Sequence, residues 1–383
     1  MSKVNELINK LCPNGVKFYK IKEISSVTIG KFVHKNKQSD DGQYPVYNGG
    51  TSNTGFYDEY NNDGHKVIIS ARGANAGFIN RVKGKYWAGN SCYTININDE
   101  SKLDWNYLYQ YLKNNQSTLL GVQQTGSIPA ISKKQVEDFK IAIPPIEVQE
   151  EIVRILDKFG ELEAELEAEL EARKSQYEFW REKLLNTGNS NQEYIALGDI
   201  GKVCMCKRIM KNETSDSGDV PFYKIGTFGK QADAYISYDI FNDYKKRFSY
   251  PKKGEILVSC SGTIGRSVVF DGEDSYFQDS NIVWLSNDES KVLNKFLYYF
   301  YQTSPWNISD GGTIKRLYNN QFISAKVPLY SLEEQKKIVN ILERFDKLIN
   351  DISEGLPAEI ELRRKQYDYY RNKLLSFEEL SCE

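Results

Sequence analysis

The chain has 383 residues, of which 40 % are hydrophobic and 27 % charged, so it is long enough for two or three ordinary globular domains. No apolar run approaches the roughly 20 residues that span a bilayer, and the first residues lack the apolar stretch of a signal peptide, which predicts a cytoplasmic protein. Six cysteines without a CxxC pair and only two histidines argue against a zinc site.

The net charge of −2 hides an uneven distribution along the chain. Residues 1–146 carry +6 and residues 187–330 carry +1, whereas residues 147–186 carry −6 and residues 331–383 carry −3. A polyanionic partner that touches only the neutral to basic regions is therefore compatible with an acidic total.

The first region, residues 1–143, alternates short apolar runs with Gly, Asn and Asp turns. The runs Lys66–Ser70 and Tyr93–Ile97 are typical of β-strands, and Asn106–Leu112 is typical of a helix near the end of the region. This pattern predicts a mixed domain of strands and helix.

Glu147–Leu185 is predicted to form one long helix, because it contains no Pro and only one Gly, and Pro144 and Pro145 mark its start. At 1.5 Å per residue it would be ~58 Å long. The tetrapeptide ELEA occurs three times in succession within it, at residues 161–172. Apolar residues recur at steps of mostly three or four, as in a helix seam: Ile152, Leu156, Phe159, Leu162, Leu166, Leu170, Tyr177, Trp180 and Leu184.

The second region, residues 187–329, matches the first in outline. Strands are predicted at Glu255–Ser259 and Ile282–Leu285 and a helix at Leu293–Tyr301. YPVYN at residues 44–48 matches VPFYK at residues 220–224, and VIISARGANAG at residues 67–77 matches ILVSCSGTIG at residues 256–265. The tyrosines of the first pair, Tyr47 and Tyr223, are expected to pack in the cores.

The long helix has a second, closely matching copy. QEEIVRILDKF at residues 149–159 returns as QKKIVNILERF at residues 335–345, an offset of 186, and RKSQYEFWREKLL at residues 173–185 returns as RRKQYDYYRNKLL at residues 363–375, an offset of 190. Gly355-Leu356-Pro357 is expected to break the second helix where the offset changes. Its predicted seam is Ile338, Leu342, Phe345, Leu348, Ile352, Ile360, Tyr367, Tyr370 and Leu374.

A search for catalytic motifs finds no dinucleotide or phosphate loop, no HExxH and no GxSxG. The Asn-Pro-Pro-aromatic box of amino-methyltransferases is also absent, since Pro144-Pro145 follows Ile143. His34 and His65 lie in polar loops and are predicted to be surface residues rather than bases. We expect no catalytic residue and no metal site in this chain.

The repeated helix motifs, the segment Glu354–Leu375 and the CPNGVKF segment at residues 12–18 together resemble the DNA specificity subunit of type I restriction–modification systems, over the full chain in order. The resemblance implies an α+β protein in which two α/β target recognition domains are separated by two long antiparallel coiled-coil helices, with an internal pseudo-two-fold repeat. The corresponding divisions are 1–143 for the first recognition domain, 144–187 for the first spacer helix, 188–329 for the second recognition domain and 330–383 for the second helical region.

The same resemblance implies partners and cofactors. Double-stranded DNA with a bipartite target, two methyltransferase subunits bound largely through the helices, and two restriction subunits as optional additions would complete the assembly. S-adenosylmethionine, ATP and Mg would belong to those subunits, and none to this chain.

Base readout is expected from loop residues with hydrogen-bonding side chains, and phosphate contacts from Lys and Arg, although most such lysines in any protein are simply solvated. Arg72 and Arg266 stand out because both lie beside matched Gly-rich loops that follow a strand. The candidates in the first region are Lys31, His34, Lys35, Lys37, Asn48, Arg72, Asn75, Gln123, Gln124, Thr125 and Ser127. Those in the second are Lys207, Arg208, Lys211, Lys224, Lys230, Thr263, Arg266, Thr313, Lys315 and Arg316.

Two other interpretations stay open at this point. A single-chain enzyme that both reads and modifies DNA is disfavoured by the missing motifs. A duplicated coiled-coil structural protein without modification partners is disfavoured by the basic first region, but the nearly neutral second region fits it.

Overall fold

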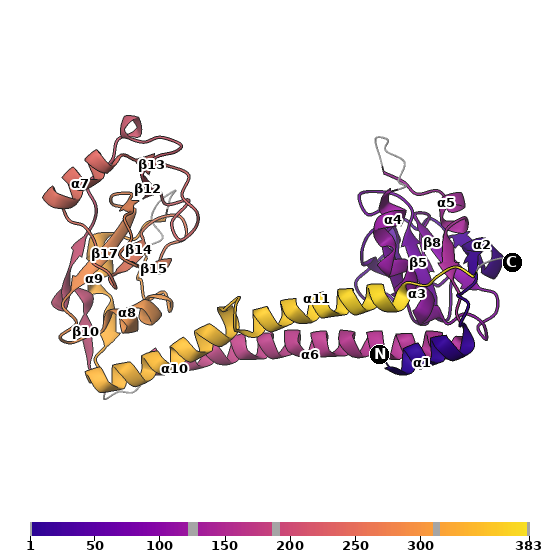
Figure 1. Cartoon of the computed structure of the whole chain (residues 1–383). Helices are drawn as coiled ribbons and strands as arrows, with labels where there is room; N and C mark the ends of the chain where they lie inside the picture. The colour runs from indigo at the N-terminus through magenta and orange to yellow at the C-terminus, as the bar shows by residue number, and fades with distance from the viewer. Residues whose placement is uncertain (1, 122–128, 186–191, 309–314, 381–383) are drawn as a thin grey trace. The chain divides into compact units, whose positions relative to one another are not determined.

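The computed structural model describes residues 2–121, 129–185, 192–308 and 315–380, and the chain divides into two compact units (Figure 1). Unit 1 comprises Met1–Glu167 and Ile360–Glu383, and unit 2 comprises Ala168–Glu359. The first division falls within helix α6 (Ile146–Leu185), the long helix that the sequence predicts. Unit 1 is therefore discontinuous in sequence, whereas unit 2 is continuous.

Unit 1 is built on three small sheets with strand orders β2-β8-β5-β6, β4-β3-β7 and β1-β9. Helix α3 packs against β5 and β6. The strands are β1 (Phe18–Lys20), β2 (Ser25–Ile29), β3 (Tyr44–Tyr47), β4 (Asn53–Tyr57), β5 (Lys66–Ser70), β6 (Ile79–Val82), β7 (Trp87–Ala88), β8 (Cys92–Ile97) and β9 (Lys140–Ala142). The helices are α1 (Ser2–Leu11), α2 (Ile21–Ile24), η1 (Lys35–Lys37), α3 (Trp105–Asn114), α4 (Gln116–Gly121) and α5 (Lys133–Glu137), followed by α6.

Unit 2 repeats this topology strand for strand, with orders β11-β17-β14-β15, β13-β12-β16 and β10-β18. Its strands are β10 (Tyr194–Ala196), β11 (Gly201–Cys204), β12 (Val220–Tyr223), β13 (Tyr235–Ile236), β14 (Ile256–Ser259), β15 (Ser267–Val269), β16 (Tyr276–Phe277), β17 (Ile282–Asn287) and β18 (Lys326–Pro328). Its helices are η2 (Leu197–Asp199), η3 (Lys211–Glu213), α7 (Tyr238–Arg247), α8 (Asn294–Tyr301), α9 (Asn319–Ser324) and α10 (Leu332–Asn350), and α11 (Leu356–Leu375) follows.

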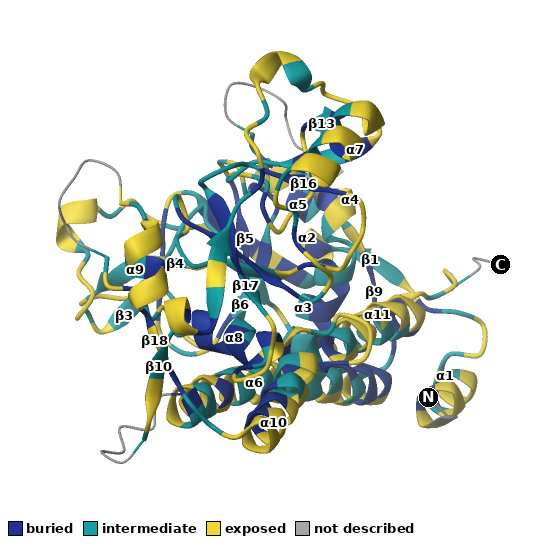
Figure 2. Cartoon of the chain, turned by 90° about the vertical axis from the view of Figure 1, so that its left-hand side faces the viewer, coloured by how far each residue is buried: buried dark blue, intermediate teal, exposed yellow. Residues whose placement is uncertain are grey.

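The central strands are apolar throughout because both of their faces are covered. In β5, Val67 and Ile69 face one hydrophobic cluster and Ile68 faces another. In β14, Ile256 and Val258 face one cluster and Leu257 a second. A strand with two buried faces shows a continuous apolar run instead of alternation, and β5 is accordingly dark blue in Figure 2.

The predicted elements are present, with additions. The strands and helices predicted in the two regions correspond to β5, β8, β14, β17, α3 and α8 within one residue at most ends. The prediction of one helical stretch per region was incomplete, because the first region also contains α1, α2, α4 and α5 and the second also contains α7 and α9. Of these, α7 is mostly exposed (yellow in Figure 2). An exposed helix shows only a weak apolar pattern, so periodicity does not reveal it.

Each unit contains an antiparallel helix pair. In unit 1 the Phe159 ring of α6 lies 5.4 Å from Tyr370 and 6.2 Å from Tyr367 of α11, and Arg364 is ion-paired with Glu163 and Glu167. In unit 2 the ring of Tyr177 on α6 lies 6.3 Å from that of Phe345 on α10. In unit 1, residues 149–159 therefore pair with residues 363–375. In unit 2, residues 335–345 pair with residues 173–185, so each pair joins the first motif of one repeat to the second motif of the other.

The helix seams are largely as predicted, with one correction. Ile152, Leu156, Tyr177, Ile338, Leu342 and Leu374 are buried, and Phe159, Leu162, Leu166, Leu170, Trp180, Leu184, Phe345, Tyr367 and Tyr370 are half-buried. Leu348 and Ile352 are 38 % and 86 % exposed, so their assignment to the seam was wrong. Helix α10 ends at Asn350, which places Ile352 in the turn before α11, and Ile349 is buried instead.

The break itself has a steric cause besides Pro357. A side chain at Gly355 would place its first carbon 2.7 Å from the carbonyl oxygens of Lys347 and Asp351. The starts of the two motifs are 24 residues apart in the first copy, within α6 (149 to 173), and 28 residues apart in the second copy, in α10 and α11 (335 to 363). The turn at residues 351–355 lies in the longer copy, where it accommodates the four additional residues.

A buried glutamine joins the start of helix α6 to the loop that precedes α3. Gln149 is fully buried, and its amide nitrogen donates to the carbonyls of Lys102 and Pro144, both at 2.8 Å, while its oxygen accepts from the Asp104 N–H at 2.9 Å. Three backbone groups from two different loops thus depend on a single side chain.

The same arrangement recurs at the start of α10. Gln335 is fully buried and donates to the carbonyls of Lys291 (2.8 Å) and Tyr330 (2.9 Å), and it accepts from the Leu293 N–H at 2.8 Å. The glutamine that opens each copy of the first motif therefore has a structural role in both units.

Replacing Gln149 by Ala leaves one buried bond and two part-buried bonds unmade. An unsatisfied buried group costs about 1–3 kcal/mol, so we expect a loss of roughly 2–4 kcal/mol in the free energy of unfolding. Urea denaturation followed by circular dichroism would measure it. Gln176→Ala on the exposed side of the same helix is the control and should change stability by less than about 0.5 kcal/mol. Equal effects of the two substitutions would contradict the structural role.

Candidate nucleic-acid interface

Four loops meet at one end of the four-stranded sheet of unit 1. The N–H of Ala71 donates to Ser91 O (2.8 Å), that of Ile131 to Ala71 O (3.0 Å), and that of Gly89 to Tyr47 O (2.7 Å). These bonds hold the segments that follow β3 and β5, precede β8 and precede α5 against one another. We call residues 48–52, 71–78, 89–91 and 129–131 loop cluster 1.

Unit 2 has an equivalent arrangement with the same three backbone bonds. The N–H of Cys260 donates to Asn281 O (2.7 Å), that of Leu317 to Cys260 O (2.8 Å), and that of Gln278 to Tyr223 O (2.9 Å). We call residues 224–230, 260–266, 278–281 and 315–317 loop cluster 2. The two clusters therefore have equivalent backbone frameworks, and each framework carries a different set of surface side chains.

The basic segment after β2 begins beside loop cluster 1. Gly30 N–H donates to Cys92 O (3.1 Å) and Lys31 N–H to Ala88 O (2.9 Å). A side chain at Gly30 would place its first carbon 2.0 Å from the Ala88 carbonyl oxygen, so only glycine permits this approach. The segment then continues through the predicted contacts His34, Lys35 and Lys37, all of which are exposed.

The other predicted residues of unit 1 have differing surroundings. Asn48 is half-buried, and its side-chain oxygen accepts from Ser91 N–H (2.9 Å), so it positions the loops of the cluster. Arg72 is exposed at the start of the loop 71–78, and Asn75 lies in its turn. Gln123, Gln124, Thr125 and Ser127 lie outside the described residues, immediately before the fourth segment of the cluster.

In unit 2 the structure brings several predicted cations to loop cluster 2. Arg266 donates to Phe228 O at 2.9 Å and Arg316 to Ser280 O at 2.6 Å, so both guanidinium groups are fixed by backbone carbonyls. Arg208 is ion-paired with Asp279. The remaining predicted residues are Lys224, which is half-buried, and Lys207, Lys211, Lys230, Thr263 and Lys315, which are exposed; Thr313 lies outside the described residues.

Arg72 and Arg266 occupy opposite ends of the equivalent loops. Gly77 N–H donates to Ser70 O, and Gly265 N–H donates to Ser259 O, so these two glycines correspond. Arg266 directly follows Gly265, whereas Arg72 lies five residues before Gly77. The sequence match located both loops correctly, but the two arginines are not counterparts.

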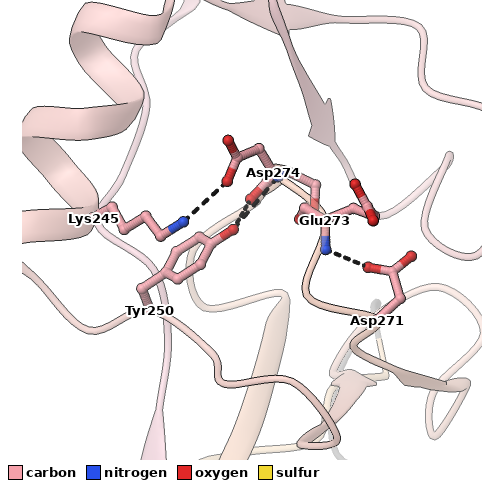
Figure 3. A network of polar contacts seen from close by, with 6 residues as sticks. Lys245, Tyr250, Asp271, Glu273 and Asp274 are labelled. Carbon is pink, nitrogen blue, oxygen red and sulfur yellow. Dashed lines mark hydrogen bonds and ion pairs between the residues drawn. The ribbon is translucent and has the colours of Figure 1, made fainter.

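Two of the predicted cations of unit 2, Arg208 and Lys224, are paired with acids. Besides Arg208, Lys224 lies 2.8 Å from Asp233, and Lys245 of α7 lies 3.0 Å from Asp274 (Figure 3). In the described part of the chain, Lys31, Lys35, Lys37 and Arg72 of unit 1 take part in no ion pair. This difference corresponds to the regional charges of +1 and +6.

The network in Figure 3 also orders the loop that carries the acids. Tyr250 donates its hydroxyl to Ser275 O (2.8 Å), and Glu273 N–H donates to the side chain of Asp271 (2.9 Å). The ammonium of Lys245 also lies 4.8 Å from the centre of the Tyr250 ring. The acidic loop is therefore fixed to α7, an element that unit 1 lacks between β4 and β5.

The sequence offered no reason to select Asp279, because carboxylates are unusual in a surface that binds an anion. Its partner Arg208 was predicted, but the pairing of residues 71 positions apart was not. The matched tyrosines, Tyr47 and Tyr223, are half-buried, and their rings pack against Tyr86 and Phe277 respectively, in agreement with the expected core role.

The cysteines of the clusters are structural. Burial raises the pKa of the Cys92 thiol to about 12 and that of the Cys260 thiol to about 11, so both thiols are protonated at neutral pH. Among the described residues, no group of three His, Cys, Asp or Glu side chains is placed to hold a metal ion. None of the described helices combines the length and apolar character that crossing a membrane requires.

Comparison with known proteins identifies the family. The type I restriction modification DNA specificity domain matches residues 13–172 and again residues 189–362. A Haemophilus influenzae protein described as a type I restriction enzyme specificity subunit is 49 % identical over 349 residues, covering 88 % of this chain and 89 % of the relative. The Escherichia coli type I restriction enzyme EcoR124I/EcoR124II specificity subunit is 31 % identical over 301 residues, covering 73 % and 72 %.

Solved structures share the fold. The type I restriction–modification S subunit from M. genitalium aligns with a TM-score of 0.57 at 19 % identity, covering 94 % of this chain and 96 % of that one. The HsdS subunit from Thermoanaerobacter tengcongensis aligns with a TM-score of 0.54 at 15 % identity, covering 95 % and 97 %.

The chain thus belongs to the DNA specificity subunits of type I restriction–modification systems. Its role is to give such a system DNA sequence specificity, and its two specificity domains fit a bipartite target. Membership of this family sets aside the alternative of a purely structural coiled-coil protein.

We expect Arg72, exposed on loop cluster 1, to read a guanine through two guanidinium hydrogen bonds. Arg72→Ala should relax one base position of the recognised sequence by about 1–3 kcal/mol of discrimination, and Arg72→Lys, which keeps the charge but loses the planar pair of donors, should relax the same position. Mapping methylated adenines in cells that carry each variant would reveal the change. A uniform loss of methylation with an unaltered sequence would instead indicate a phosphate contact.

Proposed function

We propose that this chain is the non-catalytic reading and scaffolding subunit of a type I complex, in which each unit reads one half of a bipartite DNA target. The observation that carries the proposal is the pair of loop clusters. Each cluster contains the same three equivalent backbone hydrogen bonds, and the side chains of the two clusters differ. A common framework with different surface groups suits two domains that do the same task on different base sequences. The recognition domains would correspond to residues 1–143 and 188–329.

The two helical regions, residues 144–187 and 330–383, would form the antiparallel coiled-coil spacer and give the molecule a pseudo-two-fold axis. Methylation and cleavage would reside in two methyltransferase subunits and, where present, two restriction subunits. Those subunits would supply S-adenosylmethionine, ATP and Mg, and the complex would act on DNA in the cytoplasm.

Purified chain should bind DNA without modifying it, and the mixture with its methyltransferase subunit should methylate adenine at one bipartite sequence. Incubation with S-adenosylmethionine carrying a labelled methyl group, followed by sequencing of the modified DNA, tests both statements. Methylation by the chain alone, or a continuous target without an unread gap, would contradict the proposal.

A matched pair of exposed aromatic residues supports binding of two identical partners. Phe179 and Tyr369 occupy equivalent positions of the repeated motif, and both are 59 % exposed. Each is flanked by an equivalent lysine: Lys183 lies 5.7 Å from the Phe179 ring centre, and Lys373 lies 5.9 Å from that of Tyr369. Exposed aromatic residues are typical anchors of protein interfaces, and an equivalent anchor in each unit fits one partner per unit.

We expect Phe179→Ala or Tyr369→Ala to remove one methyltransferase subunit from the complex, and the double variant to remove both. Truncating an interface anchor costs 2 kcal/mol or more, roughly 30-fold in affinity. Native mass spectrometry of the mixture would count the subunits. Leu362→Ala is the control, because Leu362 is 55 % exposed on the same helix as Tyr369 but has Ala172 as its counterpart; unchanged stoichiometry in the double variant would contradict this assignment.

The ELEA repeat is proposed to set the length of the unread gap. Four helical residues add ~6 Å and about 40° of rotation, while one base pair adds ~3.4 Å and roughly 35°, so the rotations nearly match and the translations do not. We expect deletion of residues 165–168 to shorten the gap by about one base pair. Glu165→Gln, which keeps the length, should leave the methylated sequence unchanged; an unaltered gap in the deletion variant would refute the hypothesis.

A further inference from the structure

A polar groove of about 480 Å³ lies beside loop cluster 2 within unit 2. Its lining includes Arg208, Lys224 and Asp233 and three consecutive residues of the tight loop before β17, Gln278, Asp279 and Ser280. The groove therefore offers hydrogen-bond donors and acceptors at the end of the sheet where the loops meet.

The carboxylate of Asp279 is held in place by its loop. Only 19 % of this side chain is exposed. The loop is bonded on both sides, by Gln278 N–H to Tyr223 O and by Cys260 N–H to Asn281 O, and Arg316 donates to the Ser280 carbonyl. The direction of Asp279 is thus fixed before any ligand arrives.

Asp279 in turn orients Arg208. The Nε of Arg208 donates to Asp279 Oδ2 at 2.9 Å, and the Arg208 side chain is still 67 % exposed. This bond uses Nε, so the two terminal nitrogens of the guanidinium stay available. Two parallel donors are what guanine O6 and N7 accept in the major groove.

The pairing also decides what kind of contact Arg208 can make. A cation that attracts phosphates does so through its net charge and displaces counterions from DNA. Arg208 and Asp279 together carry no net charge, so the pair has little attraction for the backbone. What remains is a planar donor pair with a fixed orientation, which costs little conformational entropy to bind.

We propose that Arg208, held by Asp279, is a specificity-determining residue that reads a guanine in the half-site recognised by unit 2. The proposal rests on the proposed function, in which each unit reads one half-site. Asp279 acts as a positioning residue, because it contacts Arg208 rather than the base.

The corresponding loops of unit 1 contain no equivalent of the Arg208–Asp279 pair among the described residues. The segment that corresponds to residues 278–281 is residues 89–91, which is one residue shorter and contains no acid. The additional residue of unit 2 is accommodated by Ser280, which has a φ of +54°. The Arg208–Asp279 pair therefore distinguishes the two half-sites instead of serving a function common to both units.

The test uses the complete complex with its methyltransferase partner and two measurements: the methylated sequence in cells, and DNA affinity at several salt concentrations. Arg208→Ala and Arg208→Lys should relax one guanine position, reducing discrimination by roughly 5- to 150-fold, and leave the other half-site unchanged. The slope of log affinity against log salt should stay the same for the double variant Arg208→Ala/Asp279→Asn, because replacing a neutral pair by two uncharged side chains leaves the local charge unchanged.

Asp279→Asn gives the sharper result, because it frees the charge of Arg208. Discrimination at the same guanine should fall, while affinity for unrelated DNA rises and the salt slope steepens by about one. The control is Arg247→Ala, which removes an arginine of unit 2 that is paired with Asp243 at 2.7 Å on α7 and should leave base preference unchanged.

Each alternative has its own signature. A double variant Arg208→Ala/Asp279→Asn that weakens binding to all sequences equally and lowers the salt slope by about one would make Arg208 a phosphate contact. Unchanged base preference in Arg208→Ala and in Asp279→Asn would leave the pair purely structural, and either result overturns the proposal. A wild-type complex without a bipartite target would refute the proposed function itself, independently of these variants.

Discussion

The buried glutamine near the start of α6 and of α10 is the contact on which the arrangement within each unit depends. Gln149 and Gln335 each satisfy three backbone groups: two lie in the loop that precedes α3 or α8, and one lies shortly before α6 or α10. An amide is suited to this task because it both donates and accepts. In each unit, directional hydrogen bonds therefore fix the orientation of the helix, α6 or α10, relative to the loop before α3 or α8. Apolar packing around these bonds adds to the attachment.

This attachment gives a physical reason for the uneven similarity of the repeats. The motif around Gln149 and Gln335 meets equivalent backbone groups in both units, and Tyr367 and Tyr177 likewise each donate a hydroxyl proton to a glutamine oxygen, Gln110 or Gln302. The loop clusters have equivalent backbone bonds but are free to vary in side chain. The two copies of a motif are therefore similar where they make equivalent contacts in both units. They differ where their side chains lie on the surface of the loop clusters.

The two units also differ in how their positive charge is held. Among the predicted contacts in the described part of the chain, Lys31, Lys35, Lys37 and Arg72 of unit 1 take part in no ion pair, whereas Arg208 and Lys224 of unit 2 are each paired with an aspartate. Unpaired cations favour any DNA through its phosphates, and paired ones favour only a ligand with matching hydrogen-bond geometry. A nearly neutral region is therefore compatible with DNA reading, and its total charge was a poor guide to its role.

Features repeated along the chain or periodic within it could be predicted from the sequence. The length of α6, the break before α11, the central strands and the correspondence of the two regions all follow from local pattern. Contacts between distant residues could not be predicted, because no local signal encodes them. The antiparallel pairing of the helices was implied only by the family resemblance, and no local pattern indicated that Asp279 meets Arg208 or that Ile352 leaves the seam.

The candidate site was predictable only in part for the same reason. The Gly-rich loops were identified from their match, and glycine marked the close approach at Gly30. The relative placement of Arg72 and Arg266 depends on loop geometry, which the residue types alone do not determine.

The discontinuity of unit 1 has a consequence for biosynthesis. Helix α11, with the tyrosine that bonds to Gln110, leaves the ribosome after all of unit 2, and at 5–20 residues per second residues 168–359 take roughly 10 to 40 s to synthesise. Unit 2 is therefore complete in sequence before unit 1, although translation of unit 1 starts first. During that interval the part of α6 that packs against α11 is without its partner helix.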